Sequence, residues 1–251
     1  MAISVLTAYD FNTARALAEA GIDYILVGDS LAMVAQGYED TKTIALGIML
    51  AATRAVRRGA PNTKIITDLP LTEVKKSAKE VLQAAKKAIK AGADIVKIES
   101  ASKETLEQIK LLRENDIEVM GHIGYTPQSF DKPTVVKDRD ELFAAAHKLQ
   151  EAGVMGMVFE MIPADIAREL TEALSIPTIG IGAGKDCSGQ VLVSDDMLGR
   201  YNLFEPKFLK RYANQYEESV KSFKAYIDDV KSGQFPGLEH SYQVAAAKAE
   251  S

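Results

Sequence analysis

Short apolar runs alternate along most of the chain with longer stretches whose apolar residues recur every three or four positions. Runs of the first kind are typical of strands buried on both faces, and the longer stretches are typical of amphipathic helices. The expected strands lie at residues 3–7, 24–27, 64–67, 95–98, 118–121, 155–159, 177–181 and 191–194. The expected helices lie at residues 12–20, 43–58, 73–91, 103–115, 140–152, 164–174 and 208–230.

This alternation predicts an α/β protein with a parallel sheet covered by helices. Seven or eight strand–helix units match a (β/α)8 TIM barrel, and a doubly wound open sheet is the alternative. The barrel is favoured because polar residues follow many strands, and because no Gly-rich turn follows the first strand. No linker or repeat divides the chain, so we expect one domain over residues 1–251, with a C-terminal helix and tail from about residue 205.

Charged or polar side chains stand at the ends of five expected strands, namely Asp29, Asp68, Glu99, His122 and Glu160. The carboxyl ends of barrel strands share one face, which is where the active sites of such barrels lie. The first three residues would be neighbours there, and their hard oxygen ligands suit Mg²⁺. A structural zinc site would need more Cys and His than the chain has.

Each of these residues also has a plainer interpretation. Asp29 in VGDS could be a helix N-cap, and Asp68 in TDLP could belong to a turn. Lys97 and Glu99 alternate along one strand and therefore share a face, either as a salt bridge or as part of a site.

His122 is one of three histidines and could be structural or catalytic. Glu160 ends the apolar run MGMVFE, a setting that suits a general base or acid near neutral pH, or a buried glutamate paired with a cation. The GIGAG sequence at residues 180–184 either binds phosphate, as after strand seven of many barrels, or only turns the backbone. Cys187 has no recognisable base partner, so we interpret it as incidental.

Composition narrows the function classes. The chain has 251 residues, 47% hydrophobic and 26% charged, which is enough for a large core. A net charge of −5 argues against a nucleic-acid partner, and the single cysteine excludes an intrachain disulfide. There is no apolar run of about 20 residues and no basic, apolar leader. We therefore expect a cytoplasmic protein without a membrane or nucleic-acid partner.

Several motifs, in order, make the chain resemble the ketopantoate hydroxymethyltransferase family from about residue 6 to residue 242. They are TAYD (7–10), LVGDSLAM (26–33), QGYEDT (36–41), AVRRGAP (55–61), DLP (68–70), AGADIVKIE (91–99), GHIGYTPQS (121–129), IPTIGIGAG (176–184), SGQVLV (188–193) and FPGLEHSY (235–242).

The resemblance implies a barrel of the phosphoenolpyruvate mutase/isocitrate lyase type. It implies an Mg²⁺ site at Asp29, Asp68 and Glu99, and contacts to a 2-oxo acid from Asp29, Ser30, Asp68 and Lys97, with His122 in the same pocket and Glu160 as proton acceptor. It also implies 3-methyl-2-oxobutanoate and 5,10-methylenetetrahydrofolate as substrates, a role in pantothenate biosynthesis, and a homo-oligomer, commonly a decamer.

Two loops depart from the family pattern, LTEVKKS at residues 71–77 and FDKPTVVKDRD at residues 130–140. They favour an alternative, a different Mg²⁺-dependent carbon–carbon lyase or aldolase acting on another 2-oxo acid. The full set of site residues argues against a paralogue that only binds. A Schiff-base mechanism at Lys97 is disfavoured because the adjacent Glu99 should keep the amine charged.

Overall fold

Eight parallel strands close into a barrel in the computed structural model, which describes residues 2–130 and 132–242. Each strand pairs with the next along the chain, and β8 pairs with β1 from Ile3↔Gly189 to Leu6↔Leu192. The predicted barrel is therefore confirmed, and the open-sheet alternative is wrong. The strands are β1 (Ile3–Thr7), β2 (Tyr24–Val27), β3 (Lys64–Asp68), β4 (Ile95–Lys97), β5 (Glu118–Gly124), β6 (Gly156–Glu160), β7 (Thr178–Ile181) and β8 (Gly189–Leu192).

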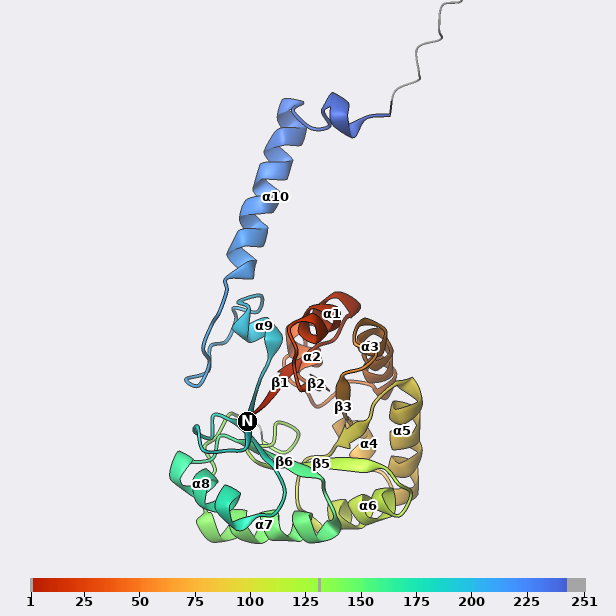
Figure 1. Ribbon diagram of the computed structural model, residues 1–251, viewed down its shortest axis with the longest axis vertical. Helices are drawn as coiled ribbons and strands as arrows, with labels where there is room; N and C mark the ends of the chain where they lie inside the picture. The colour runs from red at the N-terminus through yellow and green to blue at the C-terminus, as the bar shows by residue number, and fades with distance from the viewer. Residues whose placement is uncertain (1, 131, 243–251) are drawn as a thin grey trace, which may run out of the picture.

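Six helices that follow the strands form the outer layer of the barrel (Figure 1). Those following the first six strands are α1 (Phe11–Glu19), α3 (Leu46–Gly59), α5 (Ala78–Ala91), α6 (Lys103–Arg113), α7 (Arg139–Ala152) and α8 (Ala164–Ala173). Shorter elements are α2 (Leu31–Val34), α4 (Leu71–Val74), α9 (Ser194–Met197) and the 3₁₀ turn η1 (Leu238–His240), and α10 (Gln215–Ser232) is the long C-terminal helix.

One apolar side chain from every strand fills the barrel interior, because successive residues of a strand point to opposite faces. The layer consists of Val5, Leu26, Ile66, Ile95, Met120, Val158, Ile179 and Val191. Two larger apolar clusters lie between the strands and the helices. The barrel is thus a packed core whose open space lies at one end.

The helix expected at residues 73–91 is wrong, because two helices, α4 and α5, occupy this region. The carboxylate of Glu80 accepts hydrogen bonds from the backbone N–H (3.2 Å) and hydroxyl (2.6 Å) of Ser77. This local capping arrangement starts a new helix at Ala78 although the helical spacing continues through the break. Gly92, in the left-handed conformation, ends α5.

Two C-terminal boundaries also differ from expectation. Strand β8 begins at Gly189 and ends at Leu192, and Ser194 starts α9 while its hydroxyl donates to the Thr7 carbonyl. Helix α10 begins at Gln215 rather than residue 208, and none of its residues is buried. It projects away from the barrel (Figure 1). No helix in the described part of the chain combines the length and apolarity needed to cross a membrane.

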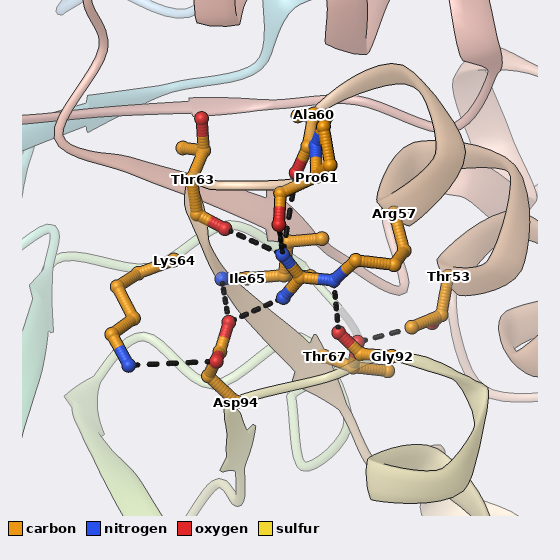
Figure 2. A network of polar contacts seen from close by, with 10 residues as sticks. All are labelled: Thr53, Arg57, Ala60, Pro61, Thr63, Lys64, Ile65, Thr67, Gly92 and Asp94. Carbon is orange, nitrogen blue, oxygen red and sulfur yellow. Dashed lines mark hydrogen bonds and ion pairs between the residues drawn. The ribbon is translucent and has the colours of Figure 1, made fainter.

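Arg57 forms a network of polar contacts at the amino-terminal end of the barrel (Figure 2). This is the end opposite the predicted site. Its Nε donates to the Gly92 carbonyl at 2.9 Å, and its Nη2 pairs with Asp94. The same guanidinium donates to the carbonyls of Ala60, Pro61 and Thr63. Asp94 also accepts the Ile65 N–H at 2.8 Å. The network joins α3 to the starts of β3 and β4, and its position indicates a role in stability.

Candidate active site

All the predicted site residues line one cavity at the carboxyl ends of the strands, namely Asp29, Ser30, Asp68, Lys97, Glu99, His122 and Glu160. They come from the ends of β2, β3, β4, β5 and β6, or from the turns that follow them. The structure thus brings together residues that are far apart in sequence. Their individual roles stay predictions.

Asp29 and Asp68 are joined through the backbone. The Asp29 N–H donates to Asp68 Oδ2 at 3.0 Å, and both residues are buried. Asp68 is the last residue of β3, and Asp29 follows β2 in the turn before α2. Ser30 is at the N-cap position of α2, which has no side-chain capping bond. The interpretation of Asp29 as a helix cap is therefore wrong.

Lys97 lies between two of the carboxylates. Its Nζ donates to Asp68 Oδ1 at 2.6 Å and lies 3.8 Å from Glu99 Oε1, which confirms that Lys97 and Glu99 share a face. Burial opposes the ammonium charge, but the carboxylates of Asp68, Glu99 and Asp29 outweigh it and raise the pKa of Lys97. An amine held in its charged form is a poor nucleophile, so the site does not favour a Schiff base.

His122 lies within β5, which continues to Gly124 rather than ending before the histidine. Its Nδ1 is 3.3 Å from Glu99 Oε1, and its Nε2 is 3.4 Å from Glu160 Oε2. These are ion-pair contacts rather than aligned hydrogen bonds. Burial lowers the pKa of His122, but the two glutamates outweigh burial and raise that pKa to about 9. The two glutamates therefore favour the protonated, imidazolium form of His122.

A glycine allows the close approach of β5 and β6 beside this histidine. Gly124 has a φ of 92°, and a Cβ there would lie 2.2 Å from the Glu160 carbonyl oxygen. Any larger residue would displace the end of β6. Gly124 therefore helps to set the position of Glu160 relative to His122.

The carboxylates of Asp29, Asp68 and Glu99 lie close together, so we asked whether they fit a divalent cation. Burial, and then the charges of Asp68 and Glu99, raise the pKa of Asp29 to about 8. A cation would relieve this repulsion. Among residues 2–130 and 132–242, however, no group of three or more His, Cys, Asp or Glu side chains is arranged to hold a metal ion. Since Mg²⁺ commonly uses one or two carboxylates and keeps several waters, the donor set still fits it.

Two residues of the site, Gln128 and Tyr9, were not predicted from the sequence. Gln128, in the GHIGYTPQS motif, donates from its backbone N–H to Glu99 Oε2 at 3.1 Å and from its Nε2 to Asp29 Oδ2 at 2.8 Å. Tyr9, in the TAYD motif, shares a 2.8 Å hydrogen bond with the Ser30 hydroxyl. The motifs were the available signal for both residues, and Tyr9 also comes two residues after the expected strand at residues 3–7.

The outer part of the cavity is mainly apolar. Its lining includes Met33, Val34, Pro127, Pro133, Tyr201, Phe204, Pro206 and Phe208. Asp196 lies among these groups, and burial together with the charge of Asp195 raises its pKa to about 6. Half of these eight residues come from the irregular chain between α9 and α10, part of which was expected to be helical.

Backbone geometry explains why glycine occupies two positions of the loop at residues 180–184. Gly182 has a φ of 62°, and a Cβ there would meet the Phe208 ring at 2.6 Å. Gly184 has a φ of 80°, and its Cβ would meet Ala164 at 2.5 Å. These contacts favour the turn interpretation over phosphate binding. Cys187 nearby is buried, and burial raises the pKa of its thiol.

The fold and the strand-end site define a (β/α)8 barrel with a cavity of charged residues at the carboxyl ends of its strands, where the active sites of such barrels lie. The barrel resembles 2,3-dimethylmalate lyase, which is described as a member of the phosphoenolpyruvate mutase/isocitrate lyase superfamily, with a TM-score of 0.64 and 18% identity over 94% of this chain and 85% of that chain. It also resembles phosphonopyruvate hydrolase in complex with oxalate and Mg²⁺, with a TM-score of 0.64 and 12% identity over 95% and 88%. At these identities the likeness establishes the fold alone.

Sequence comparison is more specific. The family profile described as ketopantoate hydroxymethyltransferase matches residues 1–238. Relatives named 3-methyl-2-oxobutanoate hydroxymethyltransferase are 44% identical in Enterococcus faecalis, over 97% of this chain and 91% of the relative, and 45% identical in Leptospira interrogans, over 96% and 94%. The chain therefore belongs to the ketopantoate hydroxymethyltransferase family, and it is a transferase. The resemblance noted from its motifs is confirmed.

Proposed function

We propose that the enzyme transfers the one-carbon unit of 5,10-methylenetetrahydrofolate to 3-methyl-2-oxobutanoate, with water supplying the hydroxyl oxygen, and gives 2-dehydropantoate for pantothenate biosynthesis together with tetrahydrofolate. The relatives' shared name supports the oxo acid, and one structural observation supports the chemistry. Lys97, Glu99, His122 and Glu160 form a continuous series of charged contacts in a single cavity. Such a site suits removal of a proton from the carbon next to a ketone.

We assign a divalent cation, Mg²⁺, to the cluster of Asp29, Asp68 and Glu99, with one or two of these carboxylates as direct ligands and water completing the coordination shell. When bound, the cation supplies Lewis-acid polarisation of the oxo acid and so stabilises an enolate. Lys97 holds Asp68 in place through the 2.6 Å hydrogen bond. With Ser30, Asp29 and Asp68, it is placed to bind the polar end of the oxo acid.

Glu160 is the base in this proposal. It ends β6, its side chain is 17% exposed, and it reaches the same cavity as the carboxylates assigned to the cation. His122 already lies between Glu99 and Glu160 as an imidazolium, so its role is to bind and orient substrate and to balance charge. Glu160 would accept the C3 proton, leaving the enolate carbon to attack the one-carbon unit.

The apolar outer wall supports the assignment of a folate donor. Flat ligand rings bind well against aromatic and apolar side chains, and Tyr201, Phe204 and Phe208 supply such surfaces beside the polar inner site. The donor would then approach the enolate from the mouth of the cavity.

The proposal predicts that the enzyme exchanges the C3 proton of 3-methyl-2-oxobutanoate in D₂O without any folate. Exchange followed by NMR should require Mg²⁺, stop on addition of EDTA and return with excess Mg²⁺. This half-reaction tests enolisation independently of the donor. Full exchange in metal-free buffer would contradict the metal assignment.

A second function is favoured by one observation. Pro133, in the loop at residues 130–140 that departs from the family pattern, lines the cavity. The alternative is a carbon–carbon lyase or aldolase that uses the same enolate chemistry on another 2-oxo acid. The same exchange assay with a series of 2-oxo acids separates the two functions. Faster exchange, by kcat/KM, of a different oxo acid would favour the alternative.

We also propose that the protein forms a homo-oligomer in the cytoplasm. Helix α10 has no buried residue and exposes Phe223, Tyr226, Ile227 and Val230. An apolar face of this kind is typical of an association surface. Light scattering at micromolar concentration should give a mass well above the 27.3 kDa of one chain. A monomeric mass would contradict the proposal.

A further inference from the structure

We propose that Gln128 is a positioning residue that fixes the carboxylates of Asp29 and Glu99 relative to each other for cation binding. This inference rests on the proposed cation site and deepens it. Gln128 is 5% exposed and lies in the loop that follows β5. It is not itself a carboxylate, and we assign it no contact with the reacting atoms.

Two hydrogen bonds join Gln128 to the two carboxylates. Its backbone N–H donates to Glu99 Oε2 at 3.1 Å, and its side-chain Nε2 donates to Asp29 Oδ2 at 2.8 Å. The Nε2 also donates to the Leu69 carbonyl at 3.3 Å. One buried residue thus ties together the carboxyl ends of β2, β3 and β4.

The surroundings determine which way the amide of Gln128 points. The Leu69 carbonyl can only accept, and the ionised Asp29 carboxylate that would bind a cation can also only accept, so the NH₂ group must face them. With the amide reversed, its oxygen would face two acceptors and both bonds would be lost. The donation to Asp29 therefore follows from the site itself.

The contacts leave a defined set of oxygens for other partners. Gln128 engages Oδ2 of Asp29 and Oε2 of Glu99. Oε1 of Glu99 faces Lys97 and His122, at 3.8 Å and 3.3 Å. The Oδ1 atom of Asp29 is the oxygen that Gln128 does not engage. Asp29 Oδ1 and Glu99 Oε1 are therefore the oxygens of these two residues that a cation can contact without displacing Gln128.

Gln128 also couples its loop to the site. The N–H groups of Ser129 and Phe130 both bond to the Thr126 carbonyl, so Gln128 lies inside a compact turn. Pro127 of the same turn lines the cavity. A shift of this turn would move Asp29 and Glu99 as well, because Gln128 donates the hydrogen bonds to both carboxylates.

The test substitutes methionine, which matches the length of glutamine but cannot donate. Gln128→Met removes the bond to Asp29 and keeps the backbone bond to Glu99. Partners that orient ligands commonly contribute about 10–100-fold to metal affinity, so we expect the dissociation constant for Mn²⁺, a probe for the site, to rise by that factor. Free Mn²⁺ is measured by electron paramagnetic resonance, with no substrate present.

Gln108→Met is the matched control. Gln108 is 3% exposed, and its Nε2 also donates two hydrogen bonds, to the carbonyls of Val74 (2.8 Å) and Lys76 (3.3 Å). It bonds to none of the site carboxylates. We expect a similar fall in melting temperature for both variants but weaker Mn²⁺ binding only for Gln128→Met. Wild-type affinity in Gln128→Met, with only the stability loss of the control, would overturn the inference.

Two further measurements keep the outcome decisive. If Gln128→Met does not fold, the fallback variant is Gln128→Asn. It retains the amide but is one methylene too short to reach Asp29, so we expect the same loss of Mn²⁺ affinity.

If the wild type neither binds Mn²⁺ nor exchanges the substrate proton, the proposed function is wrong. Crystal structures of the wild type and of Gln128→Met then decide whether Gln128 positions the carboxylates. Asp29 should move in Gln128→Met; an unmoved Asp29 and Glu99 pair would refute the role of Gln128.

Discussion

Replacing Glu160 with glutamine is expected to slow C3 proton exchange of 3-methyl-2-oxobutanoate by about 10²–10⁴-fold, the usual contribution of a positioned general base. Glutamine keeps the shape of the side chain but cannot accept the proton. Its contact partner His122 remains paired with Glu99, at 3.3 Å. Because Asp29, Asp68, Glu99 and Lys97 are unchanged, Mg²⁺-dependent binding of the oxo acid should stay close to that of the wild type.

Paired measurements, calorimetry for binding and NMR for exchange, separate the possible roles of Glu160. Glu118→Gln is the matched control, because Glu118 begins β5 at the opposite end of the barrel, where it pairs with Arg113 at 2.7 Å. This control should exchange normally. Wild-type exchange in Glu160→Gln would show that Glu160 is not the base, and it would leave His122, in its neutral imidazole form, as the candidate. Loss of binding together with exchange would instead make Glu160 a structural residue or a ligand.

The barrel could be predicted because its strands are buried on both faces and therefore appear as short apolar runs. The boundaries of helices and strands were harder to predict, because they depend on local contacts that the spacing of apolar residues does not indicate. Helical spacing continues through residues 75–77, yet the contacts between Ser77 and Glu80 start a new helix there. The spacing from Ser77 to Glu80 was a readable signal, since such pairs are typical of helix starts.

The site could be predicted as far as barrel geometry controls it. Parallel strands bring their carboxyl ends to one face, so Asp29, Asp68, Glu99 and Glu160 were found from their positions alone. Gln128 and the aromatic wall at residues 201–208 were not found. They lie on irregular segments, and the placement of such segments depends on tertiary packing rather than on a repeating pattern.

Only the structure shows which charged groups of the site contact one another. The alternation of Lys97 and Glu99 predicted a shared face, and the 3.8 Å contact confirms it. Sequence did not predict that the stronger bond of Lys97 would be to Asp68. That bond follows from the strand register, which places Asp68 of β3 opposite Lys97 of β4. The ammonium group of Lys97 therefore contacts the carboxylates of both Asp68 and Glu99.

Asp68→Asn is expected to weaken Mn²⁺ or Mg²⁺ binding and to reduce C3 exchange by about 10²-fold or more, since it removes a charged ligand candidate of the cation. The structure adds a second reason. Asp68 accepts from Lys97 Nζ through Oδ1 and from the Asp29 N–H through Oδ2. Asparagine offers one oxygen, so its NH₂ group must face one of these donors, and the buried Lys97 loses its nearest counter-charge.

Asp94→Asn separates this effect from a general loss of stability. Asp94 also pairs with a cationic side chain, Arg57, but at the amino-terminal end of the barrel (Figure 2). Both variants should melt at lower temperature than the wild type, because each removes one carboxylate from a paired charge. Only Asp68→Asn should lose cation affinity in an electron paramagnetic resonance titration with Mn²⁺, and only it should lose exchange. If Asp68→Asn binds Mn²⁺ as the wild type does, the cation site does not include Asp68, and the role of this residue is to pair with Lys97.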